Sequence, residues 1–232
     1  MEQELEIFIN RVWIAPGADR FLSFLSNYSA WAPWLLGLLM IGLIFGNFKF
    51  RAAALTIGLA IGITDGLTVN LLKHTIARPR PSQVEPGVRC VELGKPPKPL
   101  PKIMGILNDP ITSFPNGETL PHDCVGIVAA PDSSHQIQGR SFPSGHAANN
   151  MAVATVLILF YRRWGWLYLP VALLIAYARI YTGAHWPLDV GAGLLIGWIG
   201  GWLAVKLMQF LWHRFGARIF PKQYSAFPDL IA

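Results

Sequence analysis

Long apolar runs alternate with short polar connections along most of the chain. Five of these runs approach the roughly 20 residues that a helix needs to cross a bilayer. They cover residues 30–47, 52–73, 143–161, 165–181 and 186–212. A long segment rich in Pro and Gly, at about 82–140, separates the second run from the third. The pattern predicts an all-α, polytopic membrane helix bundle of about five or six helices, with one long extramembrane loop.

The segment before the first run has a different pattern. Between residues 4 and 27 the apolar side chains follow a spacing of three and four, which places them on one helical face. Those residues are Leu5, Phe8, Ile9, Val12 and Trp13. We expect residues 1–29 to form an interfacial, amphipathic helix, broken at Pro16-Gly17, that lies in the membrane surface. Residues 30–232 then form the membrane domain, which contains the insertion.

The composition agrees with a membrane protein. Of the 232 residues, 53% are hydrophobic and 14% are charged, whereas about 25% are charged in a typical soluble domain. The net charge of +6 would suit nucleic acid, but the basic residues lie at run ends and in one loop, without a basic arm. We therefore predict no nucleic-acid partner. The acidic start, Met1 to Glu4, does not resemble a cleaved signal peptide.

Lys and Arg in the short connections predict the orientation, because they mark the cytoplasmic side. With five spans, all of the following fall on one side of the membrane: Lys49, Arg51, Arg162, Arg163, Lys206, Arg214, Arg218 and Lys222. The long loop and the turn at Gly183-Ala184 then face outward. This arrangement predicts a multi-pass protein of the cytoplasmic (inner) membrane whose outward loops face the periplasm or exterior.

The two cysteines, Cys90 and Cys124, both lie in the predicted outward loop. An oxidising compartment would allow a disulfide between them. The geometry that a disulfide requires cannot be read from a sequence. Both a disulfide and two free thiols therefore stay open.

A first polar cluster ends the second run, from Lys73 to Arg80-Pro81. Prolines at 79 and 81 prevent the helix from continuing to Arg80, so the chain can fold back. Lys73 and Arg80 could then bind one anion together. The alternative is a basic stretch at the membrane surface that contacts lipid headgroups.

A second cluster, Pro143-Ser144-Gly145-His146, begins the third run. Proline at a helix start, followed by small residues, leaves backbone N–H groups available to an anion. His146 adds a titratable group in the first turn. An ordinary helix cap with a histidine at the interface is the alternative.

A third cluster joins the last two runs and contains Arg179, His185 and Asp189. The spacing of four could bring Asp189 close to His185. A carboxylate bonded to one ring nitrogen would fix the tautomer and leave the other nitrogen as a nucleophile. Arg179 ends an apolar run, where a charge is usually functional. A structural Arg–Asp pair is the alternative.

All three clusters fall on the same predicted membrane face. Together they supply fixed cations, backbone donors, two histidines and a carboxylate, which are the groups that phosphoryl transfer needs. The ordered trio resembles the type 2 phosphatidic acid phosphatase family, whose signatures are K-x6-RP, PSGH and SR-x5-H-x3-D. The resemblance covers about residues 52–200. One departure is Ala178, which stands where the family has a serine and puts one phosphate-side hydroxyl contact in doubt.

The resemblance implies a role for each matching residue. His185 would attack phosphorus, Asp189 would orient it, and His146 would protonate the leaving oxygen and then activate water. The phosphate-binding residues would be Lys73, Arg80, Ser144, Gly145 and Arg179. No cofactor and no metal are implied, and the fold would be similar to the vanadium haloperoxidase and acid phosphatase core, typically of six helices.

The implied substrate is a membrane lipid phosphate or diphosphate on the outer face of the membrane. Undecaprenyl diphosphate, phosphatidylglycerophosphate, phosphatidate and lipid A all stay open, with a slight preference for a polyprenyl diphosphate. Vanadate-dependent halide oxidation and a non-catalytic lipid-phosphate binder or transporter are alternatives. Both a monomer and a homodimer are compatible with the sequence. Gly193, Gly197 and Gly201 favour close packing within the bundle over dimerisation.

Overall fold

The structure, a computed structural model, describes residues 1–85, 88–93, 110–113, 127–128 and 140–231. In chain order its helices and strands are α1 (Glu2–Ile7), a π-helical segment (Phe8–Val12), α2 (Pro16–Ser26), α3 (Tyr28–Phe45), α4 (Phe48–Ile61), a second π-helical segment (Gly62–Val69), α5 (Asn70–Ile76), α6 (Pro81–Val84), β1 (Cys90–Leu93), β2 (Pro110–Ser113), β3 (Ile127–Val128), α7 (Gly145–Tyr161), a 3-10 turn (Gly165–Tyr168), α8 (Leu169–Tyr181), α9 (Pro187–Ile219) and α10 (Pro221–Ala226).

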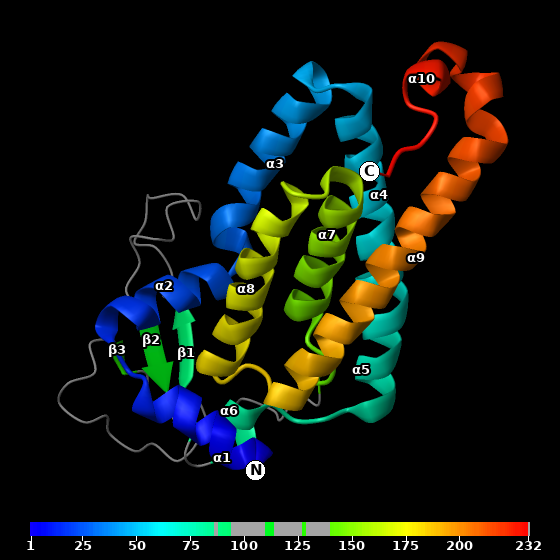
Figure 1. Cartoon of the computed structure of the whole chain (residues 1–232). Helices are drawn as coiled ribbons and strands as arrows, with labels where there is room; N and C mark the ends of the chain where they lie inside the picture. The colour runs from blue at the N-terminus through cyan, green and yellow to red at the C-terminus, as the bar shows by residue number, and fades with distance from the viewer. Residues whose placement is uncertain (86–87, 94–109, 114–126, 129–139, 232) are drawn as a thin grey trace.

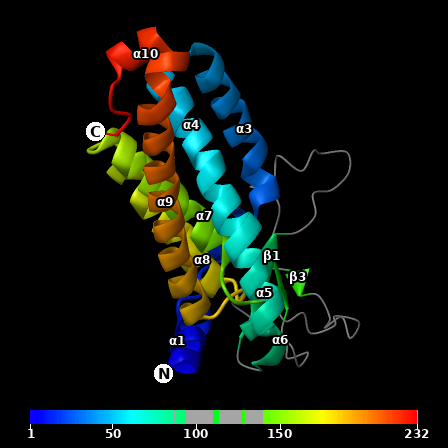
Figure 2. The same cartoon turned by 90° about the vertical axis from the view of Figure 1, so that its right-hand side faces the viewer.

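Long helices lie side by side and form a bundle (Figures 1 and 2). Within the described residues, three helical stretches are long and apolar enough to cross a membrane: Tyr28–Phe45, Phe48–Val84 and Pro187–Ile219. The other two predicted spans correspond to α7, with 17 residues, and to the shorter apolar stretch Gly165–Tyr181. The predicted all-α membrane bundle is therefore confirmed, with each of the five apolar runs in a helix.

Helix α7 lies at the centre of the bundle, where it packs against α4, α8 and α9. Its contact with α9 is close because glycines of α9 face the α7 backbone. A Cβ added at Gly193 would lie 2.5 Å from the carbonyl oxygen of Ser144, and one at Gly201 would lie 2.8 Å from that of Ala152. A Cβ added at Gly197 would likewise meet the carbonyl oxygen of Ala148. The glycine stripe thus serves packing within the chain, as small residues do between membrane helices.

Apolar side chains also cover the outside of the bundle. Only 6% of the residues of α3 are buried, and α9 also exposes a row of large apolar side chains. The exposed side chains of these two helices include Trp34, Leu35, Leu38, Ile41, Ile44, Leu195, Trp198, Trp202 and Phe210. Such a surface is costly in water and suits the hydrocarbon of a bilayer. The chain is a membrane protein.

The N-terminal helices turn their polar side toward the protein. Glu6 and Asn10 are buried, and the predicted apolar face is exposed, except for Ile9. Asn10 hydrogen bonds to the backbone of Arg89, whose buried guanidinium pairs with Asp19 at 3.1 Å. An outward apolar face suits the predicted interfacial location, although the division into 1–29 and 30–232 stays a prediction. The break between the N-terminal helices lies at residues 13–15, just before the predicted Pro16-Gly17, because Pro16 begins α2.

Part of the long insertion forms a three-stranded sheet in the order β1-β2-β3. Strand β1 is antiparallel to β2, with Cys90 opposite Ser113, and β2 is parallel to β3. Cys90 begins β1, whereas Cys124 lies outside the described residues. The pairing of the two cysteines therefore stays open, as does the full extent of the insertion.

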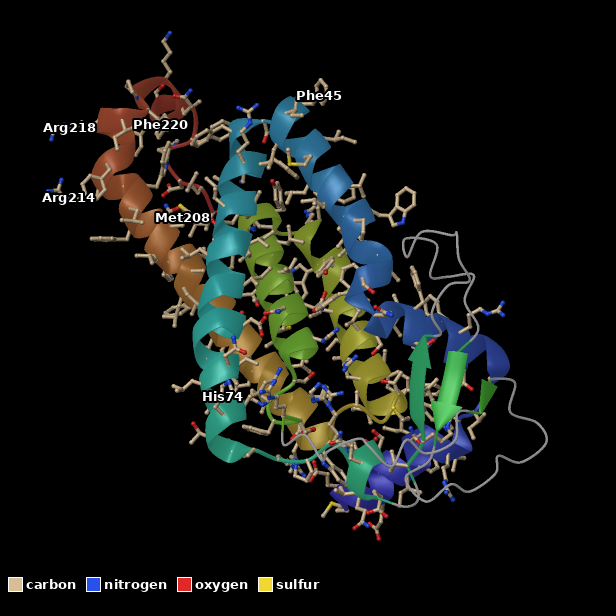
Figure 3. The ribbon with its side chains drawn as sticks, turned by 180° about the vertical axis from the view of Figure 1, so that it is seen from behind. Phe45, His74, Met208, Arg214, Arg218 and Phe220 are labelled. Atoms are coloured by element: carbon tan, nitrogen blue, oxygen red, sulfur yellow. The ribbon has the colours of Figure 1, made fainter. Side chains whose placement is uncertain are left out.

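The two ends of the bundle carry different residues. Figure 3 shows Phe45, Arg214 and Arg218 near one end and His74 near the other. The end of α5, the start of α7 and the turn from α8 to α9 all lie at the end that carries His74 (Figures 1 and 3). The three predicted clusters therefore share one end of the bundle, opposite Arg214 and Arg218.

Candidate active site

The first cluster approaches the second because the chain reverses after α5. Ala77, in the left-handed conformation at φ 47°, ends that helix, and Pro81 begins α6. The Lys73 ammonium lies 3.6 Å from the position of a Cβ added at Gly145, and an Asp65 oxygen lies 3.1 Å from it. A side chain at 145 would therefore press on both groups. Asp65 also acts electrostatically on Lys73, which gives this acid within the predicted second span a structural partner.

The second cluster forms the N-terminus of α7. Ser144 is the N-cap, and its backbone N–H donates to the carbonyl oxygen of Asp189 at 2.9 Å. Its hydroxyl is buried and has no hydrogen-bond partner among the described residues. A buried donor without a partner costs free energy unless a ligand or water satisfies it. His146 follows in the first helical turn, where its ring stacks on that of Tyr28 with centroids 3.9 Å apart.

The third cluster is a tight turn between α8 and α9. Gly183 adopts φ +69°, and the backbone N–H of His185 donates to the carbonyl oxygen of Arg179 at 3.2 Å. His185 is 3% exposed, and its Nδ1 lies 2.6 Å from the carbonyl oxygen of Ser141. A carbonyl oxygen can only accept, so Nδ1 carries the proton and Nε2 keeps its lone pair.

Two effects keep the His185 imidazole neutral. Burial lowers its pKa well below the ordinary value, and the positive charges of Arg179 and Arg80 lower it further. The hydrogen bond to Ser141 opposes this shift without reversing it. A neutral ring is the form that can attack an electrophile.

Asp189 does not contact His185 as the spacing predicts. Its carboxylate accepts from the Ser141 hydroxyl at 2.5 Å, the Trp186 backbone N–H at 3.1 Å and Arg78 Nη1 at 2.7 Å. The reason is local. Asp189 is the third residue of α9, so its side chain turns back to cap the helix start. Its link to His185 is indirect, since both residues bond to Ser141.

Each cluster contributes a residue to the lining of one cavity of about 380 Å³, namely Arg80, His146 and Arg179, whereas Lys73 and His185 are not among the lining residues. The charges of these two arginines act on both His146 and His185, and the charge of Lys73 acts on His146. Arg80 Nε is buried without a hydrogen-bond partner among the described residues. Arg80, Arg179 and His146 therefore share a space that favours an anion, and Lys73 and His185 lie close enough to interact electrostatically with His146. Asp189 lies behind this space, on Ser141.

Besides Ser141, sequence reasoning missed three further contributors to the site. Arg78 binds Asp189 and, at 2.9 Å, Glu2, and it lies over the Trp186 ring. Its position two residues before Arg80 was the available signal. Ser26 and Tyr28 line the cavity from the junction of α2 and α3, where no local pattern marks them.

The described residues contain no group of three or more His, Cys, Asp or Glu side chains that could hold a metal ion. The sequence-based expectation of metal-independent chemistry remains a prediction. It depends on the cations around the cavity, which could neutralise a phosphate directly.

Comparison with known proteins adds a family and its relatives. The profile described as "PAP2 superfamily" matches residues 52–213, which is more than half of the chain. A lipid A 4'-phosphatase of Bacteroides thetaiotaomicron is 28% identical over 224 residues, covering 94% of this chain and 80% of that protein. An undecaprenyl-diphosphatase of Sulfolobus acidocaldarius is 45% identical over 69 residues, or 29% of this chain and 33% of the relative.

A solved structure is similar as well. The crystal structure of Aquifex aeolicus LpxE superposes with a TM-score of 0.56 at 27% sequence identity. The match covers 88% of this chain and 93% of the other. The arrangement of helices is therefore shared across almost the whole of both proteins.

Proposed function

This chain belongs to the PAP2 superfamily, and from that premise we propose that it is a membrane lipid phosphatase that works through a phosphohistidine. The observation that carries the proposal is one cavity lined by Arg80, Arg179 and His146, with Lys73 and His185 close enough to interact electrostatically with these groups. Three fixed cations can neutralise the negative charge of a phosphate group. A neutral imidazole supplies the nucleophile.

In the first step His185 Nε2 forms a bond to phosphorus as the bond from phosphorus to the lipid oxygen breaks. The Ser141 carbonyl, which accepts from Nδ1–H, stabilises the charge that develops on the ring. The Lys73, Arg80 and Arg179 cations stabilise the phosphoryl oxygens. Such preorganised charge is usually the largest contribution to catalysis.

We propose that His146 takes up a proton as the negatively charged phosphate binds, gives that proton to the leaving lipid oxygen and becomes neutral. In the second step a water molecule attacks phosphorus, His146 takes the proton of that water, and the bond from phosphorus to His185 breaks. Inorganic phosphate then leaves. The Ser144 hydroxyl, buried without a described partner, and the backbone N–H of Gly145 are proposed as further donors to the phosphate.

A lipid substrate follows from the location of the site. The cavity lies at one end of an apolar bundle, so a headgroup can enter it while the acyl or prenyl chains stay in the membrane. We propose that this end faces the periplasm or exterior of the cytoplasmic membrane. The basic residues at the opposite end, including Arg214 and Arg218, support that orientation because cytoplasmic loops are enriched in Lys and Arg.

Lipid A is the substrate favoured by the comparisons, because the likeness to a lipid A 4'-phosphatase covers 94% of this chain. A polyprenyl diphosphate is the second candidate. It is favoured by the 45% identity to an undecaprenyl-diphosphatase, which is confined to 69 residues. A panel of lipid phosphates presented at equal surface concentration would rank them by kcat/KM.

The activity itself is tested with purified protein in detergent and EDTA. We expect phosphate release from a lipid phosphate, and we expect His185→Ala to abolish it. His213→Ala is the matched control, because His213 lies near the other end of α9, where it pairs with Asp229. Release that persists in His185→Ala would exclude the proposed nucleophile. Loss of release in EDTA that a divalent ion restores would indicate a metal mechanism.

A further inference from the structure

The junction between α2 and α3 brings two side chains into the cavity. Ser26 ends α2, Asn27 accepts from the backbone N–H of Ser29, and Tyr28 begins α3. Both Ser26 and Tyr28 line the same cavity as Arg179 and His146. This junction lies outside the stretch matched by the family profile, 52–213. Its contacts with the site therefore come from residues outside the stretch that the family profile matches.

Ser26 holds the arginine of the third cluster. Arg179 Nη1 donates to the Ser26 hydroxyl at 2.5 Å and to its carbonyl oxygen at 3.0 Å. The Ser26 hydroxyl also lies 3.5 Å from that of Thr182. Hydrogen bonds from a charged group are among the stronger ones in proteins. One edge of the Arg179 guanidinium is therefore held by hydrogen bonds to the last residue of α2.

Ala178, which departs from the family pattern, also packs against the N-terminal helices. This residue is buried in an apolar cluster with Ile9, Leu22 and Tyr181. A serine at that position would place its hydroxyl among apolar side chains of the N-terminal helices, at a cost in free energy. Leu22 of this cluster and Ser26 both belong to α2. The helix that packs against Ala178 therefore also supplies a hydroxyl to Arg179.

Tyr28 fixes the ring of His146. The two rings are stacked, with an interplanar angle of 5° and centroids 3.9 Å apart. Asn150 anchors the arrangement, since its Nδ2 donates to the Tyr28 hydroxyl at 3.0 Å and to the carbonyl oxygen of His146 at 2.9 Å. Tyr168 in turn donates to Asn150 at 2.8 Å. A stacked and anchored neighbour removes rotational freedom from the imidazole.

We propose that Ser26 and Tyr28 are positioning residues of the phosphatase site, in which Ser26 holds Arg179 toward the phosphate and Tyr28 holds His146 toward the leaving oxygen. The inference rests on the proposed function. It assigns the N-terminal helices a part in catalysis, because α2 and α3 present these two side chains. Preorganised groups of this kind act mainly on the transition state.

The test compares variants in the intact, purified protein with a lipid phosphate as substrate. For Ser26→Ala we expect kcat/KM to fall about tenfold, mainly through KM, as the charged hydrogen bond to Arg179 is lost. For Tyr28→Leu we expect kcat to fall about tenfold and one limb of the kcat–pH profile to move, since His146 loses its stacking partner. Tyr28→Phe keeps the ring and should retain kcat within about threefold.

Tyr224→Leu controls for a loss of stability alone, because Tyr224 contacts Trp212 at the other end of the bundle with centroids 5.6 Å apart. It should lower the thermal midpoint without changing KM or the pH profile. Tyr28→Leu with an unmoved pH profile, or Ser26→Ala with unchanged kcat/KM, would overturn the inference. If His185→Ala is inactive while both variants behave like the control, only this inference fails. An active His185→Ala would reject the proposed function instead.

Discussion

The contact between α9 and α7 offers a test whose size follows from the geometry. A Cβ added at Gly193 would lie 2.5 Å from the carbonyl oxygen of Ser144, whereas ordinary contact begins at 3.4 Å. Gly193→Ala therefore requires the helices to separate there by about 0.9 Å, because the obstacle is backbone and cannot rotate away. Overpacking of this kind costs about 1–3 kcal/mol of stability.

The separation acts directly on the site. Gly193 lies one turn after Asp189, whose carbonyl oxygen accepts from the backbone N–H of Ser144 at 2.9 Å. Moving α9 stretches this bond and displaces Asp189 from Ser141. A misplacement of about 1 Å can cost on the order of 100-fold in rate. We expect Gly193→Ala to lower kcat/KM by about tenfold to a hundredfold.

Gly191→Ala, on the same helix, is the matched control, since a Cβ added at Gly191 would meet nothing within 4 Å. It should keep full activity and gain up to about 1 kcal/mol from better helix propensity. The assay measures kcat/KM on a lipid phosphate and the thermal midpoint of both variants. If Gly193→Ala matched Gly191→Ala in both, the close packing of α9 on Ser144 would not support the site, and the reasoning would be refuted.

Two further predictions concern the charges behind the site. Arg78→Ala removes the 2.7 Å ion pair to the buried Asp189, so we expect kcat to fall about tenfold or more with little change in KM. The control is Arg163→Ala, which removes an exposed basic residue of another loop and should have no effect. Equal kcat values for the two variants would contradict the role of Arg78 in holding Asp189. Glu6 is buried without a described partner, and burial, with Asp189 and Glu2 nearby, raises its pKa to about 9. Because the folded state then holds a proton that the unfolded state releases above about pH 4.5, stability falls by up to about 1.4 kcal/mol per pH unit as the pH rises toward 9. Glu6→Gln should remove that loss, so its thermal midpoint should exceed that of the wild type increasingly from pH 6 to pH 9, and parallel curves would contradict the assignment.

The helices and their common end were predictable because their signals are local. Run length predicts a span, and Pro or Gly at a run end predicts where a helix stops. The positive-inside rule then placed Lys73, His146 and His185 on one face without any tertiary information. The structure has the three clusters at one end of the bundle (Figure 1). The helical runs and the shared end of the three clusters were therefore predictable from length and charge, whereas the side of the membrane that this end faces stays a prediction.

The details of the site depend on contacts between distant segments, and these could not be predicted. The spacing of His185 and Asp189 is compatible with a direct bond, but the helix cap and Ser141, 48 residues away, compete for the carboxylate. The burial of Asn10 likewise depends on Arg89, which lies 79 residues later in the chain. Neither partner can be identified from periodicity.

The convergence of the three clusters on one phosphate is tested most directly by a structure of the protein with orthovanadate, which resembles a phosphoryl group in transfer. We predict a bond from vanadium to His185 Nε2, with Lys73, Arg80 and Arg179 in contact with the vanadate oxygens and His146 beside the oxygen opposite Nε2. Vanadate bound outside this cavity, or within it but out of reach of His185, would contradict the mechanism.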